Sequence, residues 1–328
     1  MSKIFEALQR AEQERIAAGQ APSSPARTIE RVLSTSHHST PHAVAATLVE
    51  PPPDLASSLD APPLDIDTAG PEPLDLDRVP VIKWHPDLKR LPALEERGIG
   101  VEQFRSLRTR LFGFRDLNTL KSILVSSGLP REGKSFVAAN LAISFARHKA
   151  SRVLLIDGDM RRSSQHELLG CPSSPGLTTY LAGKASLVEV MQRAQPNEDG
   201  SPLFAGLGSL TFIAGGNEGD KAADLAGSAR FKDLIAAASP YFDWIIVDSS
   251  PVNLVTDGVN LANSCDAVLL VARGGVTKFE TAQRALSELK SSKVVGVVLN
   301  AVENPPVSDG YYGYDTYDSK IESPESPE

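Results

Sequence analysis

A glycine-rich segment from Gly128 to Ser135 constrains this chain more than any other part of its sequence. It reads G-L-P-R-E-G-K-S, which matches the phosphate-binding loop pattern G-x-x-x-x-G-K-[ST] in full. The pattern requires a strand before it and a helix after it. Residues 122–126 form a short apolar run typical of a buried strand, and residues 136–148 form an apolar stretch typical of a helix. The sequence therefore predicts a strand–loop–helix unit of an α/β fold.

Each residue type in this loop suits the binding of phosphate groups. The two glycines let the backbone curl so that successive N–H groups point at phosphate oxygens. Lys134 supplies a positive charge, and Ser135 supplies a hydroxyl for Mg²⁺. We therefore expect ATP and Mg²⁺ as ligands. The residues expected around the nucleotide are Gly128, Leu129, Pro130, Arg131, Glu132, Gly133, Lys134, Ser135 and Phe136.

Further apolar runs predict the rest of a parallel sheet. They are continuous rather than alternating, as strands covered on both faces should be. Helical stretches lie between them. We therefore expect a doubly wound, mostly parallel sheet with helices on both faces, as in P-loop nucleoside triphosphatases of the ParA/MinD type. Ligands of such folds lie beyond the C-terminal ends of the strands. The predicted strands are residues 122–126, 153–156, 210–214, 244–247, 267–272 and 294–300.

Composition divides the 328 residues into four segments. Residues 1–18 predict a short amphipathic helix, with Ile4, Phe5, Leu8 and Ala11 along one face. Residues 19–91 are rich in Pro, Ser and Ala and predict a disordered linker. Residues 92–302 predict the P-loop domain, and residues 303–328 a flexible tail rich in tyrosine.

Charge and cysteine content narrow the classes of function. The net charge is −8 and the pI about 5.4, which argues against nucleic acid as a partner. The two cysteines, Cys171 and Cys265, fit a reducing cytoplasm rather than a disulfide framework. We find no apolar run of about 18 residues, so we expect no direct membrane span, and any membrane association would go through a partner.

Carboxylates follow two of the predicted strands. Asp157 and Asp159 follow residues 153–156, and Asp248 follows residues 244–247. A carboxylate at the end of a buried strand usually pairs with a cation or caps a helix. In a chain with a P-loop, the favoured cation is Mg²⁺ bridging the β- and γ-phosphates.

These segments together resemble a known family. The P-loop, the apolar-D-G-D-M-R-R run and the apolar-D-x-x-P run resemble the Walker A, A′ and B motifs of bacterial tyrosine kinases (BY-kinases), cytoplasmic autokinases of capsule and exopolysaccharide systems. The resemblance covers roughly residues 101–317. One departure is Ser163, where the family usually has proline after the paired arginines.

The resemblance implies roles for the motif residues. Lys134 would hold the β- and γ-phosphates, and Ser135, Asp159 and Asp248 would contact the metal. Asp157 and Asp159 would divide metal contact and activation of the attacking hydroxyl, in an order that the resemblance leaves open. A carboxylate near a tyrosine hydroxyl, whose pKa is near 10, is a sensible proton acceptor. Asn300 either contacts the nucleotide base or closes a turn.

A tyrosine cluster follows the last predicted strand, in the run D-G-Y-Y-G-Y-D-T-Y-D-S-K. It contains no aliphatic residue against which the rings could pack, so we expect exposed rings. The resemblance implies that this cluster is the kinase's own substrate, phosphorylated in trans; the alternative is a low-complexity tail without chemical role. The candidate phosphoacceptors are Tyr311, Tyr312, Tyr314 and Tyr317.

A helix is predicted over residues 101–111, with Phe104, Leu107 and Leu111 on its apolar face. The adjoining face carries the pattern E-x-x-R-x-x-R, which matches a family motif associated with contacts in a ring-shaped homo-oligomer. The alternative is a solvated face with local Glu–Arg pairs. The motif residues are Glu102, Arg105 and Arg108.

Three functions compete on the sequence alone. The first is an ATP-dependent protein-tyrosine autokinase that regulates polysaccharide synthesis or export. By resemblance it would be cytoplasmic and recruited to the plasma membrane by a membrane-anchored co-polymerase or activator. The second is a ParA/MinD-type partition ATPase, which would carry a signature lysine at the position of Leu129 and no tyrosine tail. The third is a nucleotide-switched scaffold without catalysis, against which the intact motif residues argue.

Overall fold

The computed structural model describes residues 74–116, 119–149, 151–196, 207–216 and 221–303. These residues all belong to the second of two compact units, Pro71–Glu328. The helix expected at residues 1–18, most of the expected linker and the four candidate phosphoacceptor tyrosines lie outside the described residues.

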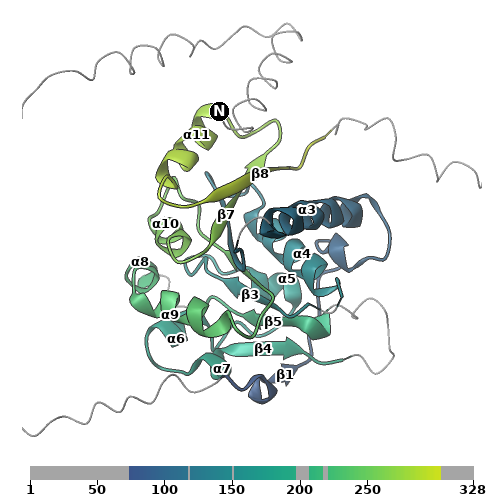
Figure 1. Ribbon diagram of the computed structural model, residues 1–328, viewed down its shortest axis with the longest axis vertical. Coiled ribbons are helices and arrows are strands. Elements are labelled where there is room, and N and C mark those ends of the chain that lie inside the picture. Colours follow the sequence, from purple (N-terminus) through teal and green to yellow (C-terminus); the bar gives the residue numbers. More distant parts are fainter. Residues whose placement is uncertain (1–73, 117–118, 150, 197–206, 217–220, 304–328) are drawn as a thin grey trace, which may run out of the picture. The chain divides into compact units, whose positions relative to one another are not determined.

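One eight-stranded sheet, in the order β1-β4-β5-β3-β6-β2-β7-β8, organises the domain (Figure 1). Neighbouring strands are parallel except β4 and β5, which are antiparallel. The six expected strands are all present, so the predicted doubly wound fold is confirmed. The strands are β1 Val81–Ile82, β2 Ser122–Ser127, β3 Val153–Asp157, β4 Met191–Ala194, β5 Leu210–Ile213, β6 Trp244–Asp248, β7 Ala267–Arg273 and β8 Val294–Asn300.

Helices cover both faces of the sheet and bury two separate hydrophobic cores. The first core lies under α3 (Ile99–Asp116), α4 (Lys134–Ala146) and α5 (Gln165–Leu169). The opposite core is covered by α6 Leu177–Leu181, α7 Leu187–Val190, α8 Ala222–Ala226, α9 Ala229–Ala238, α10 Asp257–Ala262 and α11 Phe279–Glu288. The described residues also include the short 3₁₀ helices η1 Leu76–Arg78, η2 Pro92–Leu94 and η4 Leu207–Ser209.

Aromatic packing fixes α3 and α4 onto the middle of the sheet. Trp244 of β6 is fully buried and stacks on Phe145 of α4, with ring centroids 4.2 Å apart. Phe112 of α3 meets the Trp244 ring edge-on at 5.5 Å, and Arg115 lies over the same indole. Such aromatic pairs each add about 0.5–1.5 kcal/mol beyond area burial. Because α4 begins at the P-loop, this packing also holds the loop in place.

The domain begins earlier than the sequence suggested. Val81 and Ile82 pair with β4 at the sheet edge, and Trp84 and Leu91 are buried in the first core. Residues 74–91, which were expected to belong to the linker, therefore contribute to the fold. A two-residue strand is too short to show a periodic pattern, and the prolines nearby indicated a linker instead.

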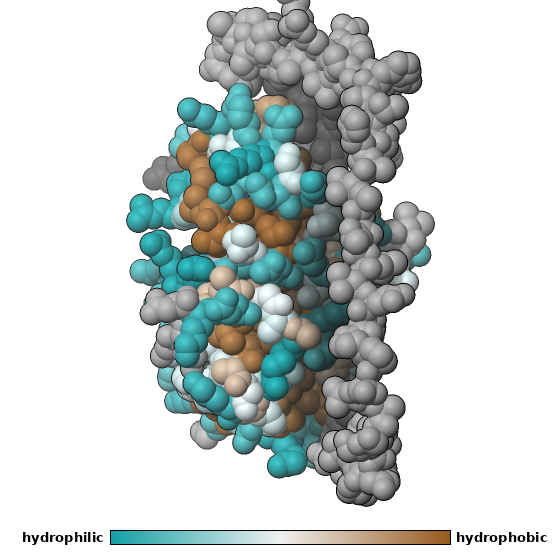
Figure 2. All heavy atoms as spheres, turned by 90° about the vertical axis from the view of Figure 1, so that its left-hand side faces the viewer, coloured by the Kyte–Doolittle hydropathy of each residue, from teal (hydrophilic) through white to brown (hydrophobic). Residues whose placement is uncertain are grey.

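Polar and apolar side chains are intermixed on the face of the domain shown in Figure 2. This is the side that carries α11, α10 and α8 in Figure 1. Large exposed hydrophobic residues of the domain include Leu254, Val276 and Leu299. Across the described ranges, none of the helices combines the length and the apolar character that crossing a membrane requires.

Candidate active site

The P-loop joins the end of β2 to the start of α4, at the C-terminal edge of the sheet. Two of its residues have left-handed backbone angles, Arg131 with φ +64° and Gly133 with φ +95°. A Cβ atom on Gly133 would collide with the side-chain amide of Asn300. Glycine is therefore required at position 133 by both backbone angle and space.

A buried glutamate braces the loop from within. One carboxylate oxygen of Glu132 accepts the N–H of Leu129 at 2.7 Å, and the other accepts the hydroxyl of Thr277. The carbonyl oxygen of Glu132 accepts the side-chain amide of Asn300 at 3.0 Å. Asn300 therefore supports the P-loop, and the Leu129 N–H, expected to face phosphate, is engaged by Glu132.

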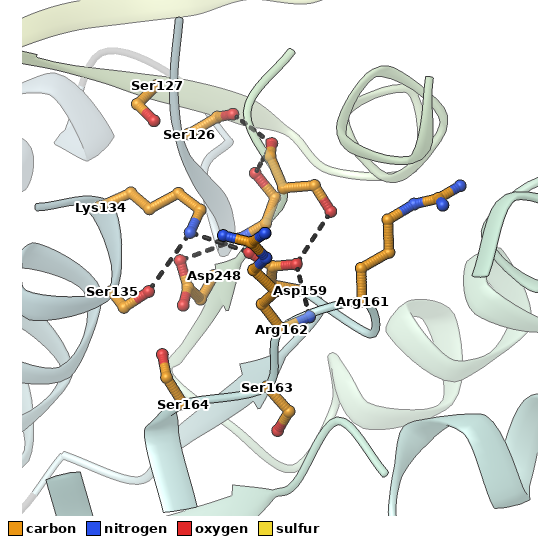
Figure 3. Close-up of polar contacts among 12 residues, drawn as sticks. Ser126, Ser127, Lys134, Ser135, Asp159, Arg161, Arg162, Ser163, Ser164 and Asp248 are labelled. Atoms are coloured by element: carbon orange, nitrogen blue, oxygen red, sulfur yellow. Dashed lines mark hydrogen bonds and ion pairs between the residues drawn. The ribbon is translucent and has the colours of Figure 1, made fainter. Parts of the chain in front are cut away.

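Lys134 forms an ion pair with Asp159, and its Nζ lies 2.9 Å from Oδ2 of the carboxylate. Figure 3 shows the two side chains pointing at each other, with Asp248 beside them and Ser135 next to the lysine. Burial works to lower the pKa of Lys134, but Asp248 and Asp159 outweigh it and the pKa is raised. The lysine therefore stays charged among the carboxylates.

Asp157 is fully buried and held by three donors at one oxygen. Its Oδ2 accepts the hydroxyl of Ser163 at 2.8 Å and the backbone N–H groups of Ser164 and Gln165 at 2.9 and 3.0 Å. Burial, with repulsion from Asp248, nevertheless raises the pKa of Asp157 to about 7. A proline at 163 would have no hydroxyl to give, so the departure from the family pattern supplies this donor.

Asp248 is fully buried on the neighbouring strand, where Asp157 and Asp248 are paired residues of β3 and β6. Burial raises the pKa of Asp248, and Lys134 opposes that shift. Three buried carboxylates, those of Asp157, Asp159 and Asp248, surround one lysine and leave positive charge in deficit at this edge of the sheet. Such a site favours binding of a further cation.

Gln165 is a site residue that the sequence reasoning missed. Its side-chain N–H₂ group donates to Oδ2 of Asp248 and to the carbonyl oxygen of Ser135, both at 3.0 Å, while its backbone N–H binds Asp157. Gln165 therefore links the P-loop at Ser135, the A′ motif at Asp157 and the B motif at Asp248. Its Oε1 atom is buried and has no hydrogen-bond partner. A glutamine at the start of a short helix belongs to no motif, so its role appears only in three dimensions.

The arginines after Asp159 are held differently from each other. The guanidinium of Arg161 forms a two-point ion pair with the buried carboxylate of Asp257, at 2.6 and 3.3 Å. The backbone N–H of Arg162 and the hydroxyl of Ser250 both donate to Oδ1 of Asp159, at 3.2 Å. These contacts fix the A′ loop against the segments that follow β6.

The donor set fits a Mg²⁺ ion bound together with a nucleotide. No three His, Cys, Asp or Glu side chains gather into a metal site of their own in the part of the chain that the structure describes. Mg²⁺ usually takes only one or two carboxylates, with waters and phosphate oxygens completing its shell. The Ser135 hydroxyl, Asp248 and the unpartnered Oε1 of Gln165 offer such oxygen atoms.

The residues of the E-x-x-R-x-x-R pattern lie on α3 and have contacts within their own chain. Arg105 pairs with Glu102 and donates to the carbonyl oxygen of Glu96 at 3.1 Å. Arg108 donates to the carbonyl oxygen of Ser144 at 2.7 Å. The local Glu–Arg pair expected as the alternative to an interface is therefore present, and a role in assembly stays a prediction.

Comparison with known proteins adds sequence evidence to this geometry. No family model matches the chain. The tyrosine-protein kinase YwqD of Bacillus subtilis is 32% identical over 222 residues, which cover 67% of this chain and 89% of that protein. This chain belongs to the bacterial tyrosine kinases. The tyrosine-protein kinase wzc of Salmonella typhimurium is 34% identical over 229 residues, covering 69% of this chain and 30% of the relative.

A solved member of the family has the same fold. The kinase domain of the Escherichia coli tyrosine kinase ETK superposes with a TM-score of 0.56 at 30% identity, covering 62% of this chain and 75% of that one. This chain spans less than a third of the length of the Salmonella relative. The family resemblance therefore applies to the P-loop domain.

Proposed function

We propose that this protein is an ATP-dependent protein-tyrosine kinase that phosphorylates its own C-terminal tyrosine cluster, in trans within an oligomer. The observation that carries the proposal is the buried group of Asp157, Asp159 and Asp248 around Lys134 at the P-loop. The named relatives are tyrosine-protein kinases, which supports a kinase over a partition ATPase. The proposed acceptors are Tyr311, Tyr312, Tyr314 and Tyr317.

The ion pair between Lys134 and Asp159 suggests how nucleotide prepares the site. With ATP bound, Lys134 would turn to the β- and γ-phosphates and leave Asp159, which would free the Oδ2 atom of Asp159 to accept a proton. Asp159 is slightly exposed whereas Asp157 is completely buried, so an incoming hydroxyl reaches Asp159 first. We therefore assign proton acceptance to Asp159 and a supporting role to Asp157.

Transfer of the γ-phosphoryl group from ATP to tyrosine exchanges one phosphorus–oxygen bond for another. The tyrosine oxygen forms a bond to the γ-phosphorus, the bond from that phosphorus to the β–γ bridging oxygen breaks, and ADP leaves. The tyrosine proton passes to the Asp159 carboxylate. Mg²⁺ would supply positive charge to the phosphates, held by Ser135 and Asp248 with Asp159 beside them. Lys134 neutralises charge that develops on the departing oxygen.

The wider setting follows from the family. The proposal includes a ring-shaped homo-oligomer built through Glu102, Arg105 and Arg108. It also includes a cytoplasmic location, with recruitment to the inner face of the plasma membrane by a membrane-anchored polysaccharide co-polymerase or activator. The output would be regulation of capsule or exopolysaccharide synthesis or export. Each phosphate adds about −1.5 to −2 charges to an already acidic tail, which would favour disassembly.

A mixing experiment tests the proposal. One full-length variant carries Lys134→Met and keeps its tyrosines; the other keeps Lys134 and has the four tail tyrosines changed to Phe. Neither should acquire tail phosphotyrosine alone, and the mixture with ATP and Mg²⁺ should phosphorylate the Lys134→Met chain. If the mixture hydrolyses ATP without tail phosphotyrosine, the partition-ATPase reading replaces the kinase.

A further inference from the structure

A basic pocket lies at the far end of α4 from the P-loop. It has a volume of about 250 Å³ and is formed where the N-terminal half of α3 meets the C-terminal end of α4. Five basic residues line it: Arg105, Arg108, Arg147, His148 and Lys149. No acidic residue lines it, although Glu102 pairs with Arg105 nearby.

The cations of this pocket crowd one another. Burial and the charge of Arg105 lower the pKa of both Arg108 and Arg147. The Nε atom of Arg108 is buried and has no hydrogen-bond partner. A buried donor on a charged group is costly when left unpaired, and a bound anion would satisfy it and relieve the repulsion.

Hydrogen bonds within the fold account for only part of the positive charge that lines this pocket. Basic residues at a helix C-terminus often serve the last carbonyl groups of that helix. Arg108 of α3 instead donates across to the carbonyl oxygen of Ser144 in the last turn of α4, and Arg147 donates to the carbonyl oxygens of Ala93 and Glu95, outside α4. Lys149 is exposed at the pocket rim. Positive charge therefore remains after these structural contacts are made.

We propose that the side of this pocket formed by Arg147, His148 and Lys149, next to the ring contact proposed at Arg105 and Arg108, docks the acidic segment 318–328 of the tail of the neighbouring copy in the ring. This inference rests on the proposed function, in which that tail is the substrate. The segment reads D-S-K-I-E-S-P-E-S-P-E, with four acidic residues against one lysine. Its charge complements the pocket, and it follows the last tyrosine of the cluster directly.

Chain lengths make the arrangement feasible. Along α4, Ser144 lies about 15 Å from Lys134, since a helix rises about 1.5 Å per residue. Tyr317 precedes Glu322 by five residues, which extend to about 17 Å, and Tyr311 precedes it by eleven, which extend to about 36 Å. Docking of Glu322 would therefore place Tyr311, Tyr312 and Tyr314 within reach of the P-loop of the same domain, with Tyr317 at the limit of its reach, and raise their local concentration there.

Peptide binding tests the docking apart from catalysis. The probe is a fluorescent peptide of residues 318–328, which contains no tyrosine. The receptor is the full chain with Glu322, Glu325 and Glu328 changed to Gln, so that its own tail does not compete. We expect saturable binding in fluorescence anisotropy that weakens with salt and drops at least fivefold with Lys149→Glu. Lys290→Glu, an exposed lysine after α11, is the matched control and should bind as before.

Kinetics test the consequence for the substrate. A peptide of residues 308–328 should have a several-fold lower KM than the same peptide with the three glutamates changed to Gln, with kcat unchanged. Equal binding of both peptides, or equal effects of Lys149→Glu and Lys290→Glu, would overturn the proposal. Binding of anionic lipid vesicles in place of the peptide would also overturn it and assign the pocket to a membrane surface.

The two proposals fail separately. If the peptide binds but the tail is not phosphorylated, docking stands and the kinase proposal fails. If the tail is phosphorylated with no dependence on the glutamates, the kinase proposal stands and docking fails.

Discussion

The two ends of α4 carry opposite charge. At its N-terminal end, three buried aspartates surround Lys134. At its C-terminal end, four cationic side chains gather around His148, whose pKa is lowered by burial, and one of them, Arg105, pairs with Glu102. Both ends hold more charge of one sign than the protein itself balances. The first is suited to a cation bound with nucleotide and the second to an anionic segment, so one helix connects the reaction site with a site for its substrate.

The largest effect is expected from removing the cation at the N-terminal end. Lys134→Met leaves three carboxylates without their positive partner. Breaking a buried ion pair in this way costs about 3–5 kcal/mol. The variant should show a clearly lower free energy of unfolding in urea at pH 8, and a smaller loss at pH 5, where Asp157 can bind a proton.

A loss of the same size at both pH values would show that the charge of Asp157 does not contribute to the effect of removing the lysine. Lys290→Met serves as the control, because Lys290 is exposed and far along the chain from the site.

A substitution of Gln165 is the second test of the site at the N-terminal end of α4. Gln165→Leu removes the donor that Asp248 and the Ser135 carbonyl share, leaving buried acceptors that cost about 1–3 kcal/mol. We expect kcat for tail phosphorylation to fall about tenfold and the Mg²⁺ concentration for half-maximal rate to rise. Gln165→Glu should be worse, since it adds a carboxylate to an acidic site.

If the Mg²⁺ concentration for half-maximal rate is unchanged in Gln165→Leu, Gln165 contributes to packing and not to metal binding. A matched control is Gln192→Leu, because Gln192 is also buried but lies on β4.

The pH dependence of stability follows from Asp157. Its pKa in the folded protein is raised from 3.8 to about 7, so the folded state binds more protons than the unfolded chain between these values. The free energy of unfolding should therefore fall as pH rises from about 4 to 7 and then level off. Without nucleotide, the Tm should drop by a few degrees across this window, and Asp157→Asn should flatten the curve.

Differential scanning fluorimetry at several pH values measures both proteins. A Tm that rises over the same window in the wild type would contradict the raised pKa.

The smallest effect is expected at the C-terminal end. Glu102 and Arg105 are both well exposed, so Glu102→Gln should change stability by less than about 1 kcal/mol. Removing this negative charge should tighten binding of the 318–328 peptide about twofold in fluorescence anisotropy. Weaker binding would mean that Glu102 organises the pocket rather than opposing its ligand.

Elements that are local in the sequence could be predicted from it, whereas contacts between distant residues could not. The P-loop and the six main strands are each continuous in the chain, so a local pattern predicted them: a motif match for the loop and continuous apolar runs for the strands. The contact between Gln165 and Asp248 joins residues 83 positions apart, and the two halves of the basic pocket come from separate helices. Such contacts depend on packing and carry no local pattern.

Residue roles show the same limit. The sequence favours neither a base contact nor a turn for Asn300, and in the structure its side-chain amide donates to the carbonyl oxygen of Glu132 in the P-loop. The order of Asp157 and Asp159 could not be derived from spacing, because only the fold shows that Ser163, Ser164 and Gln165 all bind Asp157. The edge strand β1 has only two residues, too few to be recognised, and β4 reads M-Q-R-A, which is not a continuous apolar run.

Mass-spectrometric mapping of phosphate on the full chain tests the central claim most directly. After incubation with ATP and Mg²⁺, we predict phosphate on the cluster formed by Tyr311, Tyr312, Tyr314 and Tyr317, and none on the same peptide of Lys134→Met. Consumption of ATP with an unmodified cluster, or equal phosphate on the Lys134→Met chain, would contradict the account.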